Sequence, residues 1–376
     1  MKGELYFLLL EKVDTQKGNG KNRKKMALSK EQNSLPNGDH FDSYFCDDLH
    51  SSQSHPITRY WQQKSTITFS PKDFVLPIFL MMDESANESI ENFPNIKRMG
   101  SKTLIDFLSP LISEFSLQSI LLFPCLKNTS VKKIDDAFDV EQNPLIKGID
   151  LIKKKFPQLL IIVDVCLCTF TEHGHCCVFR ETNGQIDNEK SVEILSRLAV
   201  QYARCGADII APSDMMDSRV FHIRKQLNLN GFENVAILSY AAKFESCFYG
   251  PFRNAANSWP KFGDRKQYQL PMGSKGMALR GAERDIRQGA DMVMVKPAMA
   301  YLDIVQSISN NHPNIPIAVY QVSGEYSMIK IASENGIFPL QKIVFETLAS
   351  FKRAGASIII TYFTPEILKW IKSEMF

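Results

Sequence analysis

The chain has 376 residues, 44% of them hydrophobic and 23% charged, which is typical of a globular protein with a large core. Its 44 Lys and Arg against 41 Asp and Glu give a net charge of +3, which is too balanced to indicate a nucleic-acid partner. No apolar run reaches the roughly 18 residues that a membrane span needs, and residues 6–10 lack the flanks of a signal peptide. The sequence therefore predicts a cytoplasmic protein that binds neither nucleic acid nor membrane.

Residues 1–55 differ from the rest of the chain in composition. They are polar, carry a basic cluster at residues 21–25 and show no helical or strand period. This composition favours a flexible N-terminal extension or arm, residues 1–55, ahead of a folded catalytic domain at residues 56–376.

From about residue 74 onward, short aliphatic runs alternate with longer amphipathic stretches. These runs are almost continuously apolar, as strands buried on both faces of a parallel sheet are. The predicted strands lie at residues 75–80, 119–123, 160–167, 208–211, 236–240, 291–295, 316–320 and 357–362. The helical patterns between them include residues 148–156, 189–205, 280–289, 301–310 and 340–353.

This alternation of β and α units favours a closed (β/α)8 barrel, a TIM barrel, over an open doubly wound sheet. No glycine-rich phosphate loop follows the first run, which also weighs against a dinucleotide-binding fold. Catalytic groups of such barrels lie at the carboxyl ends of the strands, so the residues that follow each run are the candidates for a site.

Two lysines occupy such positions. Lys296 follows the run at 291–295 directly, and Lys243 comes shortly after the run at 236–240. A single lysine there is most often a solvated surface residue, but two at the rim of one apolar barrel would each favour the neutral amine. Because a neutral lysine is a nucleophile for ketones, the pair indicates two carbonyl substrates, or one Schiff-base lysine with a partner that tunes it.

Three cysteines, Cys166, Cys168 and Cys176, lie close together after the third run. They are one ligand short of a structural zinc site, and they match a catalytic site, which keeps one position open. The alternative is a set of structural cysteines near a strand end. A redox pair is disfavoured because the segment has no Cys-X-X-Cys.

Residues 244–275 form a long connection after Lys243, and long loops in compact barrels are usually active-site lids. Arg253 and Arg265 lie in this segment and can bind a carboxylate in bidentate fashion, unless they are two surface arginines on a mobile loop. Ser323 and Tyr362, at the ends of the last two runs, can hold a second carboxylate by hydrogen bonds.

Together with their neighbours, these residues resemble the δ-aminolevulinic acid dehydratase family, also called porphobilinogen synthases. The resemblance runs from about His55 to Trp370. It is carried by the segments at 164–168, 173–176, 211–217, 239–244, 247–253, 294–297, 301–305 and 322–325. The three cysteines are typical of the zinc-dependent branch, since the magnesium-dependent branch has aspartate and alanine at those positions.

The resemblance implies that two molecules of 5-aminolevulinate condense to the pyrrole porphobilinogen, with loss of two waters, in tetrapyrrole synthesis. Lys296 would form a Schiff base with the substrate that supplies the propionate side, and Lys243 with the one that supplies the acetate side. Zinc on the cysteines would polarise the second substrate or deliver hydroxide. The resemblance also implies a homo-octamer, in which the N-terminal segment embraces a neighbouring subunit.

The same resemblance assigns the residues that bind or surround the substrates. They are Arg253, Arg265 and Gln269 for the second carboxylate, Ser323 and Tyr362 for the first, and Asp164 and Ser213 for the pocket wall. Some zinc-type members have a second zinc site on a histidine and a cysteine, where this chain has His175 but Gln267. Gln288 stands in place of a frequent glutamate and weakens the case for an allosteric magnesium.

Two other functions fit part of the pattern. A class I aldolase also uses a strand-end Schiff-base lysine on this fold, but it needs one lysine and no metal. An inactive zinc-binding paralogue would keep the barrel, but it does not explain why both lysines, both arginines and the Ser323–Tyr362 pair are all present.

Overall fold

The computed structural model describes residues 68–126 and 132–374. The predicted N-terminal extension at residues 1–55 lies outside this range, as do residues 56–67 of the predicted catalytic domain. By its internal contacts the chain divides into two units, residues 1–68 and 69–376, and the fold below is that of the second unit.

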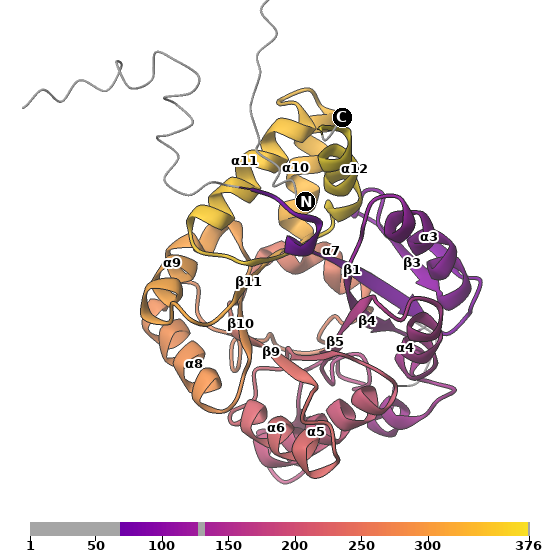
Figure 1. The fold of residues 1–376 in the computed structure, drawn as a ribbon. Helices are drawn as coiled ribbons and strands as arrows, with labels where there is room; N and C mark the ends of the chain where they lie inside the picture. Colours follow the sequence, from indigo (N-terminus) through magenta and orange to yellow (C-terminus); the bar gives the residue numbers. More distant parts are fainter. Residues whose placement is uncertain (1–67, 127–131, 375–376) are drawn as a thin grey trace, which may run out of the picture. The chain divides into compact units, whose positions relative to one another are not determined.

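The core of this unit is a closed barrel of parallel strands, as the sequence predicts (Figure 1). The barrel strands are β1 (Phe74–Met81), β4 (Ser119–Cys125), β5 (Leu160–Val165), β8 (Ile209–Pro212), β9 (Ala236–Lys243), β10 (Met292–Lys296), β11 (Ile317–Gln321) and β12 (Ile358–Thr361). The last strand pairs with the first, with Phe74 opposite Ile359, and this pairing closes the ring. Nearly every strand residue is buried, which explains the continuous apolar runs.

Strand β9 is longer than its apolar run predicts. The run was expected to end at residue 240, but the strand continues through two alanines to Lys243. Lys243 pairs directly with Lys296, the last residue of β10. Both lysines are therefore strand residues rather than loop residues, and a rigid ladder fixes their separation.

Helices surround the barrel in Figure 1, and they follow the strands in regular alternation. They are α3 (Ser101–Ser113), α4 (Pro144–Lys155), α5 (Asn188–Arg204), α6 (Arg219–Leu229), α7 (Gly250–Ala255), α8 (Lys275–Arg287), α9 (Leu302–Asn311), α10 (Ser323–Glu334), α11 (Leu340–Arg353) and α12 (Thr364–Glu374). Each predicted helical pattern coincides with one of these, and α11 has the predicted bounds. Each of α3, α4, α5, α9 and α11 packs an apolar stripe inward, such as Leu104, Leu108 and Leu111 of α3.

Short elements lie between the barrel strands and helices, most of them after the carboxyl end of a strand, whereas η1 precedes β1. A hairpin of β2 (Asn87–Ser89) and β3 (Lys97–Gly100) follows β1, and β3 pairs in parallel with the end of β1. A second hairpin, β6 (Val178–Phe179) and β7 (Ile186–Asp187), follows the cysteine segment. The 3-10 turns are η1 (Pro71–Asp73), η2 (Ile134–Phe138), η3 (Cys247–Tyr249) and η4 (Met299–Tyr301).

Gly100 fixes the position of the first hairpin. A Cβ atom there would lie 1.9 Å from the carbonyl oxygen of Asp83, so only glycine allows the loop after β1 to approach this closely. The close approach holds β3 against the barrel.

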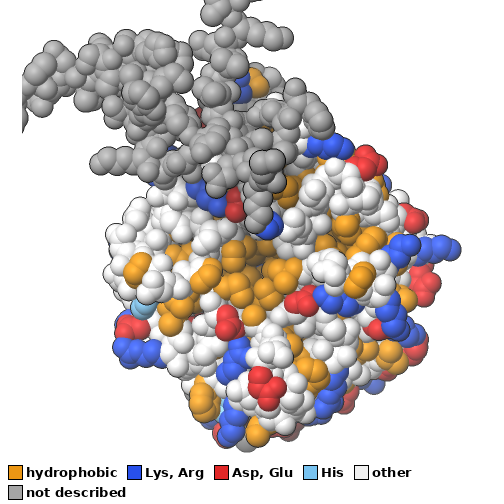
Figure 2. Space-filling view, viewed as in Figure 1, with side chains coloured by type: hydrophobic (Ala, Val, Ile, Leu, Met, Phe, Trp, Pro, Cys, Tyr) orange, Lys and Arg blue, Asp and Glu red, His pale blue; other side chains and the backbone are white. Residues whose placement is uncertain are grey.

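Figure 2, drawn from the same side as Figure 1, shows apolar side chains at the hollowed centre of this face and charged side chains around its rim. Among the described residues, none of the helices combines the length and the apolar character that crossing a bilayer requires.

Candidate functional site

A small cavity at the carboxyl ends of the strands brings together most of the residues that the sequence analysis selected. Its volume is about 20 Å³, room for little more than one water molecule. It is lined by Phe123, Pro124, Asp164, Cys166, Cys168, Thr169, Ser213, Lys243, Phe252, Ala256, Arg265 and Lys296. The carboxyl end of a barrel is where catalytic groups of this fold converge, so this cavity is the candidate active site.

Both strand-end lysines are buried at the cavity, Lys243 with 6% and Lys296 with 4% of its surface exposed. They share an aromatic neighbour, since their Nζ atoms lie 5.6 and 5.1 Å from the centre of the Tyr240 ring. Lys296 has further aromatic neighbours, and the closest is Tyr320, whose ring centre lies 4.2 Å from its Nζ. Burial therefore removes both amines from bulk water, as the sequence predicts.

The two amines differ in their surroundings. Burial, and next the positive charge of Lys243, lower the pKa of Lys296 to about 7. Lys243 instead donates a hydrogen bond of 2.5 Å from its Nζ to the carbonyl oxygen of Ser213. At neutral pH a large fraction of Lys296 is therefore the free amine, the form that attacks carbonyl carbon.

The carboxyl group of Asp164 faces the same cavity from β5. Burial raises its pKa to about 6, and the nearby charge of Lys243 partly opposes that rise. Its Oδ1 atom is buried without a hydrogen-bond partner. A buried acceptor that the protein leaves unpaired is a candidate to bond a ligand.

The three predicted metal ligands meet on one side of the cavity. The Sγ atoms of Cys166, Cys168 and Cys176 all lie within 4.8 Å of one another, and the first two are 3.3 Å apart. All three side chains are buried. Interactions with Cys166 and then Cys168 hold the pKa of Cys176 well below its usual value, so the cluster readily carries a thiolate. Within the described residues this is the group that can hold a metal ion.

His175 and Gln267, which stand at the positions of the second zinc site of some zinc-type members, do not form a cluster like that of the three cysteines. His175 uses both ring nitrogens within the protein, with Nδ1 3.0 Å from the hydroxyl of Tyr268 and Nε2 2.9 Å from the carbonyl oxygen of Phe262. Gln267 lines a separate cavity together with Gln288. The side chain of His175 is thus occupied as a hydrogen-bonding group.

The segment at 244–275 covers the cavity with η3, α7 and the connection that follows. Phe252, Ala256 and Arg265 of this segment line the cavity. Arg265 is 5% exposed and donates from Nη2 to the carbonyl oxygens of Gly174 and Ser258. It is therefore a buried, fixed residue rather than a surface arginine on a loop.

Arg253 and Gln269 are also in this segment but do not line the small cavity. The guanidinium of Arg253 lies 5.1 Å from the centre of the Trp259 ring, and its Nε has no hydrogen-bond partner. Gln269 is 2% exposed, and both its amide nitrogen and its amide oxygen are unpaired, as is Nε of Arg265. The segment thus contains several buried N–H donors without partners, and a carboxylate would satisfy them.

Ser323 and Tyr362 are buried next to residues that contact Lys296. Ser323 Oγ accepts a hydrogen bond from the backbone N–H of Phe252 at 3.0 Å and donates to the carbonyl oxygen of Phe248 at 3.2 Å. The hydroxyls of Tyr362 and Tyr320 are 2.9 Å apart. The predicted pair thus reaches the lysine through Phe252 and Tyr320 in this structure, not directly.

An aromatic wall surrounds Lys296, and its two strand tyrosines, Tyr240 and Tyr320, are not among the residues that the sequence indicates. Tyr240, Tyr249, Phe252 and Tyr320 all place a ring within 5.4 Å of its Nζ. Tyr240 and Tyr320 both lie within predicted strands, at residues 236–240 and 316–320. Their signal was their position near the carboxyl ends of neighbouring runs.

Comparisons with known proteins agree on one family. Residues 47–370 match the family model described as Delta-aminolevulinic acid dehydratase. The chain is 46% identical to the Delta-aminolevulinic acid dehydratase of Bos taurus, over 86% of this chain and 98% of that protein. It is also 46% identical to the protein of that name from Dictyostelium discoideum, over 86% of this chain and 96% of the other.

A solved structure is similar as well. It is the delta-aminolevulinic acid dehydratase (porphobilinogen synthase) of Toxoplasma gondii in complex with its reaction product, porphobilinogen. The two chains are 35% identical, with a TM-score of 0.81, and the match covers 86% of this chain and 91% of the other.

Proposed function

This chain belongs to the Delta-aminolevulinic acid dehydratase family, and we propose that it condenses two molecules of 5-aminolevulinate to porphobilinogen with loss of two waters. The observation that carries the proposal is the direct pairing of Lys243 and Lys296 on neighbouring strands. Two buried amines beside one aromatic ring can hold two carbonyl substrates next to each other. An aldolase would need only one of them.

Lys296 is the proposed first nucleophile. With a pKa near 7, it offers a neutral amine that adds to the ketone of the first substrate and, with loss of water, forms a Schiff base. Lys243 is the proposed second nucleophile. Its Nζ leaves the carbonyl oxygen of Ser213 when it bonds to the second substrate.

We propose that polar residues in the cavity transfer the protons during these steps. Asp164, whose pKa is raised to about 6, can exist in both protonation states near neutral pH. We propose that Asp164 and Ser213 accept and return the protons of the amines and of the departing water. Both residues line the cavity together with the two lysines.

The carboxylates of the two substrates would bind on opposite sides. Arg265, Arg253 and Gln269 present unpaired buried donors, which suit the carboxylate of the second substrate. Ser323 and Tyr362 are proposed to bind that of the first. Since Ser323 now bonds to Phe248 and Phe252, it would exchange these partners for the substrate.

Zinc is the proposed cofactor, held by Cys166, Cys168 and Cys176. The residues fit the ion, because three buried thiol sulfurs converge and sulfur donors favour zinc over magnesium or calcium. Three protein ligands are also the number typical of catalytic zinc. Bound there, zinc would supply a Lewis acid that polarises a carbonyl oxygen.

We propose that residues 244–275 act as a lid. The inner cavity of about 20 Å³ is far too small for two substrate molecules, so the segment that covers it has to move before they bind. We also propose a cytoplasmic homo-octamer, in which the N-terminal segment near residues 55–63 contacts a neighbouring subunit. The described cysteines are all free thiols, which suits a reducing compartment.

The purified protein, incubated with 5-aminolevulinate, is expected to form a pyrrole that reacts with Ehrlich's reagent, and zinc chelation is expected to abolish it. Full activity after metal removal would rule out the zinc assignment. Borohydride reduction in the presence of substrate, followed by peptide mapping, should label Lys296. A missing adduct at both lysines would rule out the Schiff-base mechanism, and a labelled lysine without pyrrole would favour an aldolase.

A further inference from the structure

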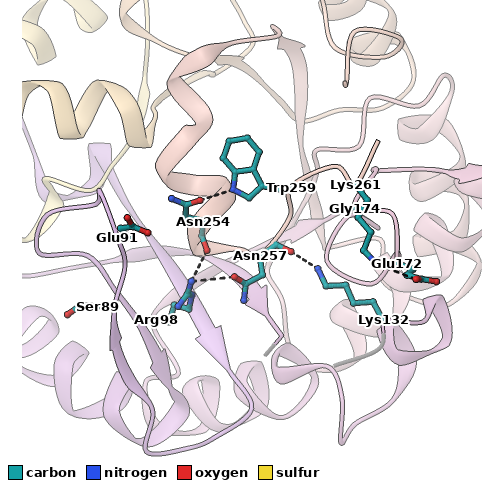
Figure 3. Close-up of a pocket in the computed structure, with 10 residues that line it drawn as sticks. All are labelled: Ser89, Glu91, Arg98, Lys132, Glu172, Gly174, Asn254, Asn257, Trp259 and Lys261. Carbon is teal, nitrogen blue, oxygen red and sulfur yellow. Dashed lines mark hydrogen bonds and ion pairs between the residues drawn. The ribbon is translucent and has the colours of Figure 1, made fainter. Parts of the chain in front are cut away.

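Helix α7 is the wall between two cavities. On its inner side, Phe252 and the following Ala256 line the small cavity that contains Lys296. On its outer side, Asn254 and the following Asn257 line a larger cavity of about 590 Å³ (Figure 3). Residues of and directly after this one short helix therefore line both cavities.

The carboxyl end of α7 is held by Arg98 from hairpin strand β3. Nε of Arg98 donates to the carbonyl oxygen of Ala255 and Nη2 to that of Asn254, both at 2.7 Å. The last carbonyls of a helix have no donor within the helix, so an outside donor is needed to satisfy them. Figure 3 shows the guanidinium pointing at the end of α7, with dashed lines to Asn254 and Asn257.

Two further donors hold the same end. The thiol of Cys125, at the end of β4, donates to the carbonyl oxygen of Ala255 over 3.2 Å. Nζ of Lys132 donates to the carbonyl oxygen of Asn257 over 2.5 Å. Only Arg98 bonds two carbonyls at once, because its planar guanidinium has several donors in a fixed geometry.

Arg98 itself is fixed by the barrel. Its backbone pairs with Phe79 of β1, and Gly100 allows the hairpin to lie close to the loop after that strand. Its side chain is only 15% exposed, and it has two further partners, Glu88, whose carboxylate lies 3.2 Å from Nη1, and Oδ1 of Asn257, 3.5 Å from Nη2. A donor on a rigid strand can set the position of the helix that it bonds.

The amino end of α7 is bound on another side. The backbone N–H of Phe252 donates to Ser323 of α10, and Gly324 packs against Phe248, where a Cβ atom would lie 2.6 Å from the carbonyl oxygen. The helix is thus held at both ends by residues that are far away in sequence. If Ser323 turns to a substrate carboxylate, the contact with Arg98 becomes the main tether.

We propose that Arg98 is a positioning residue that holds the carboxyl end of α7, so that Phe252 stays in place against Lys296. Nothing requires Arg98 to touch the substrate. Its effect on turnover rests on the proposed function, whereas its effect on α7 does not.

The direct test is hydrogen–deuterium exchange of the full chain without substrate. In Arg98→Met, which keeps most of the apolar stem, amides at residues 250–258 are expected to exchange roughly tenfold faster or more, since two charge-assisted hydrogen bonds are lost. The matched control is Glu88→Gln, which removes the negative charge of the surface partner of Arg98 but keeps both helix contacts. It should exchange like the unchanged protein.

The second readout is the separation of KM from kcat in the pyrrole assay. If α7 is displaced in Arg98→Met, KM is expected to rise while the melting temperature stays within a few degrees of that of the unchanged chain. A merely structural role for Arg98 lowers the melting temperature and the active fraction, and it leaves KM unchanged. Because exchange is measured without substrate, it still tests Arg98 if the chain makes no pyrrole.

Arg98→Lys serves if Arg98→Met does not fold. Lysine keeps the charge but bonds one carbonyl where arginine bonds two. The exchange rate and KM of Arg98→Lys are therefore expected to lie between those of the unchanged chain and those of a chain that has lost both helix contacts. Unchanged exchange at residues 250–258 in a folded Arg98 variant would overturn the proposal. Equal acceleration in Glu88→Gln would also overturn it.

Discussion

Lys296 points its Nζ at the ring of Tyr320, 4.2 Å from the ring centre. A ring face stabilises a cation to some extent, yet the pKa of this lysine is lowered to about 7. Loss of hydration therefore outweighs the attraction of the ring, and the positive charge of Lys243 adds to the shift. The aromatic wall acts mainly by excluding water.

The first prediction concerns pH. Borohydride trapping of substrate on Lys296 should rise as the pH rises through about 7, because the neutral amine is the reactive form. In Lys243→Met the midpoint, which is the pH at which trapping on Lys296 is half-maximal, should be higher, because a like charge that disfavours protonation is removed. The trapping rate against pH measures both. Lys154→Met, at an exposed site, should leave the midpoint in place, and an unmoved midpoint in Lys243→Met would contradict the coupling.

The second prediction concerns the first carboxylate. Tyr362→Phe should raise KM for 5-aminolevulinate roughly tenfold, the effect of losing one hydrogen bond to a charged group. Tyr326→Phe is the control, because its hydroxyl lies in the same aromatic cluster but donates to the carbonyl oxygen of Pro94. Steady-state kinetics separate KM from kcat. Equal changes in the two variants would show that the cluster acts only through packing.

The third prediction concerns the metal. Cys166→Ser should weaken zinc binding by at least the roughly 10–100-fold that loss of an outer partner costs, since a ligand atom itself is removed. Bound zinc after dialysis against a weak chelator is the measurement. Cys205→Ser is the matched control, because that thiol is half-buried and lies outside the cluster. Equal zinc content in the two variants would exclude the cysteine site.

The fourth prediction concerns the support beneath the site. Arg219 is fully buried, with Nη2 3.3 Å from Asp285 and Nε 3.6 Å from Asp214, the neighbour of Ser213. Arg219→Met leaves the buried carboxylate of Asp214 without its ion-pair partner, while Asp285 keeps Arg284 at 2.9 Å. The loss should lower the free energy of unfolding by about 3–5 kcal/mol. Arg287→Gln breaks an exposed ion pair and should cost about 1 kcal/mol or less in urea unfolding. If Arg219→Met lowered the free energy of unfolding by only about 1 kcal/mol or less, the buried ion pairs would not stabilise the barrel as argued.

The sequence predicts the barrel well because burial on both faces leaves a continuous apolar run for each strand. It also places Lys243, Lys296 and the cysteines, since chemically distinctive residues stand where those runs stop. It does not predict that β9 extends to Lys243, because alanines have no strong strand preference. Nor does it predict Arg98, whose role depends on a contact with α7 that no local pattern encodes.

The pairing of β1 with β12 affects how the barrel folds. One edge of β1 stays unpaired until β12 has been synthesised, because Phe74 pairs with Ile359 on that side. Pairing so distant in sequence is slow, and an open parallel edge invites aggregation meanwhile. A chain truncated before β12 would leave two such edges, so we expect it to require chaperones, although every residue of the lysine and cysteine sites would already be present.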